Sequence, residues 1–404
     1  MTDPKITVII PTRERCDVLE SSLRTATSQD YENLEIIVSD NCSGDDTPDV
    51  VRRAHDRRIR YLNTGKRLSM SHNWEFALSH VDEGWVTFMG DDDGLMPAAL
   101  SSVADIIRAT NAKAIRSSFC TYDWPMITGN KHGQLIVPRT TRLEVRETCR
   151  WLSRVMHGRA RYSQLPMIYN GGFIHTSILK EIRAKTGSYF LSASPDVYSA
   201  IAISRSIDRY VYTGVPLAIS GTSGHSNGHS FFSANKQRNE IPRTKFANEG
   251  NIPFHASVPL CVDGSYPLSL QVCAYEAYMQ SESLGNPVPG INPAQQLEVI
   301  MATAGKHRTS IAKWGEAFAE MHQLDYGTAQ RSAELKRYLL QSTAMIRKIF
   351  NAANSVITET LPISNIHEAS IAAAVIRSSP GRMDSLRFLA SRLASLSKQL
   401  TQSD

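Results

Sequence analysis

The first 110 residues alternate short apolar runs with stretches of helical spacing, and this alternation limits the fold more than any other feature. The first run, Ile6–Ile10, is β-branched and ends at Pro11, which is typical of a buried parallel strand. The stretch 16–28 places its apolar residues on one side of a helix. Further strands are expected over 34–38, 59–62 and 85–89, and further helices over 47–54, 69–79 and 97–107. Strands that alternate with helices through short connections predict a doubly wound α/β sheet.

The pattern changes along the rest of the chain. Strands are expected over 114–119, 134–137, 209–212 and 217–220, and helices over 142–156, 177–185 and 195–204. Beyond about residue 250 the strand signal fades, and helices are expected over 271–280, 293–304, 311–322, 329–350 and 383–400. We therefore expect an α/β domain over residues 1–240 and a mainly helical region over 241–404.

Composition excludes several classes of protein. The formal net charge of +5 over 404 residues fits an anionic ligand but gives no argument for nucleic-acid binding. No apolar run is long enough to span a bilayer, and the chain enters its first strand without a signal peptide. A cytoplasmic protein is therefore expected. No GxGxxG motif follows the first strand, which disfavours a dinucleotide oxidoreductase.

Three consecutive carboxylates, Asp91, Asp92 and Asp93, follow the fourth expected strand and precede the helix at Pro97. Packed at the edge of a sheet they repel one another, so a cation or solvent is needed beside them. Mg²⁺ and Mn²⁺ bind carboxylate oxygens and share them with substrate phosphates. The alternative is a solvated acidic loop in which Asp93 favours the helix N-terminus.

Polar residues also follow the first two strands, and ligands of open α/β sheets bind at such strand ends. Thr12, Arg13 and Glu14 come after the first strand, and Asp40 and Asn41 come after the second. Asp or Asn side chains at this position can hydrogen-bond a nucleobase. The alternative is an Asx turn that caps the next helix through Asp46 or Thr47, and both can be true together.

In their order and spacing, segments 8–13, 38–47 and 91–97 resemble family 2 glycosyltransferases with the GT-A fold, over about residues 5–225. The resemblance implies a GT-A type doubly wound mixed sheet with a C-terminal helical appendage. It implies inverting transfer from a nucleoside-diphosphate sugar, with UDP-sugar favoured, to a carbohydrate or lipid-linked glycan acceptor in surface polysaccharide or glycan biosynthesis. It also implies a Mn²⁺ or Mg²⁺ cofactor. The Gln-x-x-Arg-Trp motif of the processive synthases in this family is absent, so transfer of a single sugar is expected.

The resemblance also assigns the residues that hold the donor. They are Pro11, Thr12, Arg13, Glu14, Asp40, Asn41, Asn73, Asp91 and Asp92. The family usually has two aspartates where this chain has Asp40 and Asn41, which leaves open which of them contacts the base.

The metal ligands implied are Asp92, Asp93 and His225. Asp92 takes the place of the second aspartate of the family's Asp-x-Asp motif when the segments are anchored on Pro97, and Asp91 then faces the ribose or the metal. His225 lies in a glycine-rich stretch, 220–229, that can close over the donor. A solvated loop histidine is the alternative.

Asp196 is the candidate catalytic base. In the family a carboxylate at the start of a helix, about a hundred residues after the metal motif, takes the proton of the acceptor hydroxyl. Ser194 and Pro195 are suited to the N-cap and the first helical position, which places Asp196 in the first turn. The alternative is an aspartate that only complements the helix dipole, and such a position is expected to lower its pKa.

The last expected helix, 383–400, has a basic face and an apolar face. It would suit peripheral attachment to the inner face of the plasma membrane, or packing on its own domain or on a second copy in a homo-oligomer. Two other functions compete with sugar transfer: a sugar nucleotidyltransferase, and a non-catalytic carbohydrate-binding or assembly protein on a GT-A scaffold.

Overall fold

The computed structural model describes residues 3–128, 133–224, 249–285, 287–358 and 361–379. The first elements are β1 (Ile6–Thr12), α1 (Cys16–Thr27), β2 (Leu34–Asp40), α2 (Thr47–Arg53), β3 (Ile59–Asn63), α3 (Met70–Leu78), β4 (Trp85–Phe88), β5 (Gly94–Leu95) and α4 (Ala99–Thr110). They are followed by β6 (Ala114–Asp123), α5 (Pro125–Thr128), β7 (Gln134–Pro138), β8 (Leu143–Glu147), α6 (Thr148–Met156), β9 (Gly172–His175), α7 (Thr176–Thr186), α8 (Pro195–Ser206) and β10 (Arg209–Thr222). The last are α11 (Leu270–Gln280), α12 (Pro293–Thr303), α13 (Arg308–Met321), α14 (Tyr326–Ala353), β11 (Ser355–Thr358) and α15 (Ile366–Ser378).

The described strands form one mixed sheet with the central order β11-β7-β6-β9-β4-β1-β2-β3. β1 is parallel to both β2 and β4, and β2 is parallel to β3. β9 is antiparallel to β4, and β10 pairs with β6 in parallel and with β8 in antiparallel. The expected α/β fold class, a mixed sheet followed by C-terminal helices, is confirmed.

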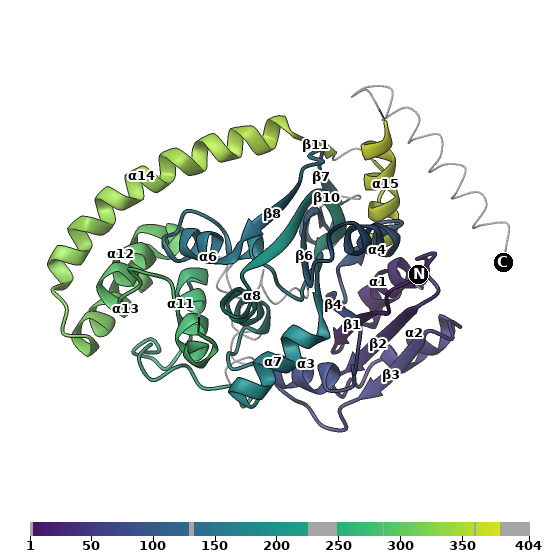
Figure 1. The fold of residues 1–404 in the computed structure, drawn as a ribbon, viewed down its shortest axis with the longest axis horizontal. Helices are drawn as coiled ribbons and strands as arrows, with labels where there is room; N and C mark the ends of the chain where they lie inside the picture. The colour runs from purple at the N-terminus through teal and green to yellow at the C-terminus, as the bar shows by residue number, and fades with distance from the viewer. Residues whose placement is uncertain (1–2, 129–132, 225–248, 286, 359–360, 380–404) are drawn as a thin grey trace.

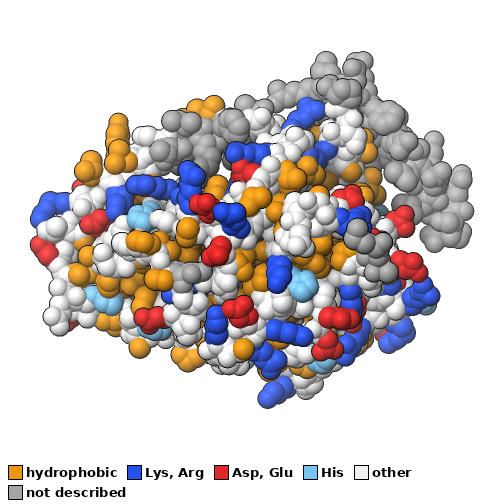
Figure 2. Space-filling model, viewed as in Figure 1, with side chains coloured by type: hydrophobic (Ala, Val, Ile, Leu, Met, Phe, Trp, Pro, Cys, Tyr) orange, Lys and Arg blue, Asp and Glu red, His pale blue; other side chains and the backbone are white. Residues whose placement is uncertain are grey.

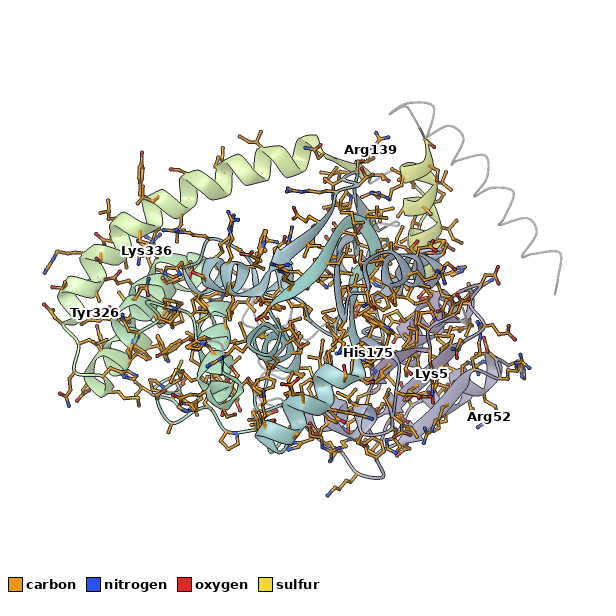
Figure 3. The ribbon with its side chains drawn as sticks, viewed as in Figure 1. Lys5, Arg52, Arg139, His175, Tyr326 and Lys336 are labelled. Carbon is orange, nitrogen blue, oxygen red and sulfur yellow. The ribbon has the colours of Figure 1, made fainter. Side chains whose placement is uncertain are left out.

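Helices cover both faces of this sheet, which explains why its central strands are apolar throughout. Successive side chains of β1 point to opposite faces. Val8 packs with Ile6 and Ile10 in the cluster that contains α1, α4 and α15. Ile9 packs in the second cluster, with α3, α7 and α8. Side chains fill the space between sheet and helices on both sides (Figure 3).

The C-terminal helices first lead away from the sheet and then return to it (Figure 1). α11 packs on α8, and α12 packs against α13 and α14. β11 then pairs antiparallel with β7, and α15 contacts α1 and β7. β11 therefore extends the N-terminal sheet, and α15 packs beside it. The expected boundary at residue 240 lies outside the described residues and stays a prediction.

Several elements differ from the sequence predictions. The expected helix over 142–156 is wrong in its first third, because Leu143–Glu147 forms β8 and only Thr148–Met156 is helical. Leu143 and Val145 alternate with charged residues, which is a strand pattern, and pairing with β10 selects it. β9, β11 and α15 have no counterpart among the predicted elements. The expected helix over 383–400 lies outside the described residues.

Charges of both signs are interspersed over the face shown in Figure 2. The described part of this face therefore lacks the single-sign patch that is typical of a nucleic-acid-binding protein. Within the described part of the chain, none of the helices combines the length and the hydrophobicity needed to cross a membrane.

Candidate active site

The site begins where β1, β2 and β4 end. Thr12, the last residue of β1, is paired with Asp40, the last residue of β2. The Thr12 carbonyl accepts a hydrogen bond of 2.9 Å from the backbone N–H of Asn41, and the N–H of Met89 donates to Ile9 at 2.9 Å. Because these strands are parallel, the loops that follow them leave the sheet at one edge.

Glu14 connects the loops that follow β1 and β2. Its backbone has a positive φ of 53°, and its N–H donates to the Ser43 hydroxyl at 2.9 Å. Its carboxylate accepts from the N–H of Gly44 at 3.1 Å and pairs with Arg67. Arg13 forms an ion pair of 2.5 Å with Glu249. The contacts of Glu14 hold the loops after β1 and β2 together at this edge of the sheet.

Asp40 and Asn41, expected to contact the base, are both buried and hydrogen-bonded to the protein. The Asp40 carboxylate accepts from Tyr61 at 2.5 Å, from Asn63 at 3.1 Å and from the N–H of Ser43 at 2.9 Å. The Asn41 side-chain amide makes two hydrogen bonds of 2.8 Å with the backbone of Leu68, one as donor and one as acceptor. Their contacts shape the loops, Asp46 makes no side-chain hydrogen bond as the N-cap of α2, and contact of Asp40 or Asn41 with a base stays a prediction.

Asn73 lies on α3 and is also buried. Its side-chain oxygen accepts a hydrogen bond of 2.8 Å from the hydroxyl of Ser39 in β2. Asn73 therefore fixes the start of α3 against the carboxyl end of the neighbouring strand.

The acidic triplet after β4 is buried, with Asp91, Asp92 and Asp93 only 2%, 6% and 1% exposed. The alternative of a solvated acidic loop is therefore wrong. Arg15 forms an ion pair of 2.8 Å with Asp91. Burial raises the pKa of Asp91 and Asp93, and the neighbouring charge of Asp92 raises both further. Three buried carboxylates with one arginine beside them favour an additional cation.

Asp92 and Asp93 are also held by β10 and by Ser223, which follows it. The Asp92 carboxylate accepts from the N–H and the hydroxyl of Ser223 at 3.2 and 2.6 Å. Asp93 accepts from the N–H of Gly221 at 2.7 Å and from Tyr169 at 2.6 Å. A Cβ on Gly221 would lie 1.8 Å from the carbonyl oxygen of Asp92, so only glycine lets β10 pass this closely.

Asp196 lies in the first turn of α8, as predicted, after Ser194 and Pro195. It is partly buried, and its carboxylate accepts a hydrogen bond of 2.7 Å from the hydroxyl of Tyr162. Burial raises the pKa of Asp196, although the bond from Tyr162 opposes this rise. The expected lowering of this pKa by the helix N-terminus is therefore wrong, because desolvation outweighs it.

Tyr169 shows that the triplet and Asp196 share one region. Its hydroxyl is buried, and the negative charges of Asp93, Asp92 and Asp196 all act on it. Burial and these charges raise the pKa of Tyr169 well above its ordinary value. The neutral hydroxyl is thus a fixed hydrogen-bond donor between the acidic turn and the start of α8.

Sequence reasoning missed the two tyrosines and the arginine that positions them. Arg116 in β6 is buried and donates to the carbonyl oxygens of Ser163, Tyr169 and Asn170 at 2.7, 2.9 and 2.8 Å. It therefore clamps the loop that carries Tyr162 and Tyr169. A charged residue inside an apolar strand was the available signal, since buried arginines are rare unless they hold a partner.

The carboxylates partly fit a divalent cation. Among the residues that the structure describes, no three His, Cys, Asp or Glu side chains converge as a ligand set. Both Asp93 and Asp92 accept hydrogen bonds from the protein, Asp93 from the N–H groups of Gly90 and Gly221 and Asp92 from Ser223. Mg²⁺ commonly takes one or two carboxylates and completes its shell with substrate phosphates and water. The described residues therefore supply only part of a metal shell, and a cation at this site stays a prediction.

His225 lies outside the described residues, so its expected role as a ligand stays a prediction. The expected lid over 220–229 is wrong at its start, because Ser220, Gly221 and Thr222 belong to β10.

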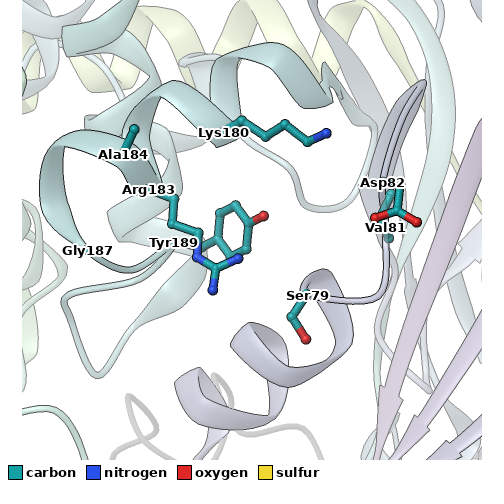
Figure 4. Close-up of a pocket in the computed structure, with 8 residues that line it drawn as sticks. All are labelled: Ser79, Val81, Asp82, Lys180, Arg183, Ala184, Gly187 and Tyr189. Carbon is teal, nitrogen blue, oxygen red and sulfur yellow. The ribbon is translucent and has the colours of Figure 1, made fainter.

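A shallow pocket of about 430 Å³ lies between the C-terminal end of α3 and α7 (Figure 4). Its lining includes Ser79, Asp82, Lys180 and Arg183, with the Arg183 guanidinium 5.0 Å from the centre of the Tyr189 ring. It lies near the amino end of β4, whereas the acidic triplet follows the carboxyl end. None of the predicted site residues lines it.

The chain is similar to known proteins over its N-terminal part. Residues 7–161 match the family described as "Glycosyl transferase family 2". A stretch of 103 residues is 41% identical to the GalNAc(5)-diNAcBac-PP-undecaprenol beta-1,3-glucosyltransferase of Campylobacter jejuni, and covers 25% of this chain and 33% of that protein. A stretch of 97 residues is 27% identical to the UDP-Glc:alpha-D-GlcNAc-diphosphoundecaprenol beta-1,3-glucosyltransferase WfaP of Escherichia coli, and covers 24% of this chain and 39% of that protein.

The chain thus matches well under half the length of these curated relatives. Among solved structures, S. aureus TarS 1-349 in complex with UDP-GlcNAc is similar at 14% identity and a TM-score of 0.47, over 83% of this chain and 92% of that one. This structural likeness is too weak to carry a conclusion. Residues 7–161 of this chain are thus similar to glycosyl transferase family 2, the family that the sequence motifs resemble.

Proposed function

We propose that this protein transfers a single sugar, with inversion, from a nucleoside-diphosphate sugar to a lipid-linked glycan acceptor. The observation that carries the proposal is the meeting of the buried acidic triplet and Asp196 at one edge of the sheet, with Tyr169 between them. This edge is where the loops after β1 and β2 come together. A donor bound there would present its diphosphate to the triplet and its sugar toward Asp196.

The relatives support the choice of substrates. The protein from Escherichia coli is named for a UDP-glucose donor, and both relatives are named for undecaprenyl-diphosphate-linked acceptors. We therefore favour a UDP-sugar as donor and a polyprenyl-diphosphate-linked glycan as acceptor, in the assembly of a surface polysaccharide or glycan.

Asp196 is proposed as the base. As the acceptor oxygen attacks the anomeric carbon, its proton passes to the Asp196 carboxylate and the bond from the sugar to the diphosphate breaks. A raised pKa makes this carboxylate a better proton acceptor, since the efficiency of a base increases with its pKa up to the working pH. Tyr162 holds the carboxylate in one orientation.

Asp92 is proposed as the main protein ligand of a Mn²⁺ or Mg²⁺ ion, with Asp91 held by Arg15 and Asp93 supporting the turn. When bound, such an ion neutralises charge that develops on the leaving diphosphate. Arg15 lies beside Asp91 and would add a second positive charge at the same place.

The identity of the donor can be tested with UDP-, GDP- and dTDP-sugars, each added to the full chain with Mn²⁺. Two quantities are measured: the shift in unfolding temperature and the rate at which each nucleotide sugar is slowly hydrolysed. We expect one class to raise the unfolding temperature, because a ligand that binds only the folded state stabilises it. In Asp92→Ala the part of this shift that depends on Mn²⁺ should vanish, whereas Asp105→Ala, at an exposed position on α4, should behave as wild type.

Two results would contradict the proposal. An Mn²⁺-dependent shift of normal size in Asp92→Ala would exclude Asp92 as the ligand. If no nucleotide sugar stabilises the protein and none is hydrolysed, the assignment as a glycosyltransferase is overturned. That result would favour a non-catalytic protein on this scaffold.

A further inference from the structure

Asn170 lies at the carboxyl end of β4, next to the acidic turn. Its N–H donates to the carbonyl of Phe88, the last residue of β4, at 3.0 Å, and its own carbonyl accepts from Arg116 at 2.8 Å. The preceding residue, Tyr169, donates to Asp93 of the triplet at 2.6 Å. Contacts on both sides therefore fix the backbone of Asn170 beside the triplet, and none of them involves its side chain.

The side-chain oxygen of Asn170 is buried without a hydrogen-bond partner. Asn170 is only 6% exposed, and this oxygen receives no hydrogen bond from any described residue. Two other asparagines of the same edge differ from it. Both side-chain atoms of Asn41 are bonded to the backbone of Leu68, and both of Asn73 are bonded to Ser39. Asn41 and Asn73 thus hold the loops in place, whereas the Asn170 oxygen makes no such contact.

Backbone conformation alone does not account for this asparagine. Asn170 has a positive φ of 47°, a region that asparagine enters more readily than most residues. Glycine adopts the same φ without burying an amide. Among the described non-glycine residues with positive φ, Asn170 is the one that is buried. An unpaired buried amide oxygen lowers stability, because it gives up its hydrogen bonds to water, and a ligand that supplies a donor would offset this cost.

The place of Asn170 in the site selects the sugar as this ligand. In the proposed function the diphosphate lies at the triplet, and the reacting carbon of the sugar lies between it and Asp196. Tyr169 spans the same interval, since it donates to Asp93 and the charge of Asp196 also acts on it. Because Asn170 is the next residue along the chain, a sugar that lies beside Tyr169 also lies near Asn170.

A sugar hydroxyl matches a carboxamide in its chemistry. The amide oxygen accepts hydrogen bonds and the amide nitrogen donates them, whereas each hydroxyl can do both. The sugars of nucleotide donors differ chiefly in which hydroxyls they have and how these are oriented. A site that hydrogen-bonds a particular hydroxyl rejects an analogue without it, because the protein group then stays unpaired. A fixed amide can therefore distinguish one sugar from another.

We propose that the Asn170 carboxamide hydrogen-bonds a hydroxyl of the transferred sugar and thereby helps to select the donor. The proposal rests on the proposed function, because it takes the sugar to lie between the triplet and Asp196. Nucleotide and sugar can be varied separately in the experiment, so its failure can be told from a failure of the transferase assignment.

The test compares UDP with UDP-glucose, the donor for which the relative from Escherichia coli is named, by calorimetric titration of the full chain with Mn²⁺. If the thermal-shift screen selects another nucleotide sugar, that sugar and its nucleotide replace these two. Asn170→Gly removes the amide and suits the left-handed backbone. It should weaken UDP-glucose binding about three- to tenfold, through loss of one hydrogen bond, and leave UDP binding unchanged. Asn111→Gly is the matched control, because Asn111 is also left-handed but is exposed at the C-cap of α4.

The wild type should also bind UDP-glucose about tenfold more tightly than one of its monodeoxy analogues, and Asn170→Gly should lose this preference. Equal binding of UDP-glucose and every monodeoxy analogue by the wild type would overturn the proposal, since water would then satisfy the amide. So would wild-type affinity of Asn170→Gly for UDP-glucose, or equal weakening of UDP and UDP-glucose in that variant. These results leave the transferase assignment intact, whereas a wild type that binds no nucleotide sugar overturns both.

Discussion

Asp196 combines the two properties that a proton acceptor needs, a raised pKa and a fixed orientation. Burial raises the pKa, and the hydroxyl of Tyr162 holds one carboxylate oxygen at 2.7 Å. A carboxylate that served only the helix dipole would gain nothing from such burial, because desolvation weakens its charged form. The environment of Asp196 therefore favours the catalytic interpretation over the capping one.

Asp196→Asn should leave donor affinity intact and reduce transfer by about 10²–10⁴-fold, the usual contribution of a general base. Initial rates of transfer and donor-induced thermal shifts measure the two quantities separately. Asp208→Asn, at an exposed position just after α8, is the control and should keep full activity. Transfer near the wild-type rate in Asp196→Asn would remove this residue from the mechanism.

At the scale of elements, the segment that leads into α8 is held by two helices, α3 and α11. Glu75 of α3 accepts from the N–H groups of Tyr189 and Phe190 at 2.8 and 3.1 Å. Ser71 donates to the carbonyl of Ser192 at 2.6 Å, and the hydroxyl of Ser192 donates to Glu276 of α11 at 2.6 Å. The helices beyond residue 250 thus contact the segment that positions Asp196.

Glu276 should make stability depend on pH. Burial raises its pKa from 4.5 to about 7, so the folded protein favours the protonated carboxyl. Its contribution is fully present below the ordinary Glu pKa and is lost as the pH rises through about 7. The wild type should therefore be less stable at about pH 8 than at about pH 5, by up to roughly 3 kcal/mol from this group.

Glu276→Gln removes the titration and should flatten this dependence in chemical unfolding at the two pH values. Glu282→Gln, an exposed neighbour in sequence, should keep the wild-type dependence. A profile for Glu276→Gln that matches the wild type would mean that other groups cause the pH dependence.

The elements show where prediction from sequence succeeds. β1 to β4 and the helices between them begin and end within two residues of the predicted ranges, because each is a strongly patterned local segment. β9 and β11 have four residues each, and pairing with distant strands defines them. Such short strands leave no local pattern to find.

The residues of the site likewise fall into two groups, those that the sequence predicts and those that it does not. Asp92 and Asp196 follow a strand end and open a helix, so motif and spacing locate them. Tyr162, Tyr169 and Arg116 act through contacts between segments about 50 residues apart. Their roles depend on tertiary packing, which a single sequence does not display.

At the scale of the whole molecule, the C-terminal region both extends the sheet and covers it. The residues of 361–376 that join the cluster around α1 are Leu361, Ile363, Ile366, Ala369, Ala372, Ala373 and Ile376. Arg377 and Arg139 add hydrogen bonds between α15 and the end of β7. The sheet is therefore complete only when residues from both ends of the chain are present.

A chain ended at residue 354 should be much less stable than one ended at residue 379. Each large buried side chain of the lost segment contributes roughly 1.5–3 kcal/mol, so together they are comparable with the net stability of a domain. Thermal unfolding and soluble yield measure the difference, and the chain ended at 379 is the control. Equal melting temperatures would show that β11 and α15 are dispensable.

The return of β11 to β7 also sets an order of events during synthesis. Pro138 of β7 leaves the ribosome about 217 residues before its partner Ser355, since 355 − 138 = 217. At about 5–20 residues per second this interval lasts roughly ten to forty seconds. Throughout it the edge of β7 offers unpaired backbone groups to other nascent chains. The fraction of the protein that reaches its native state should therefore depend on the temperature of synthesis and on whether a chaperone is present.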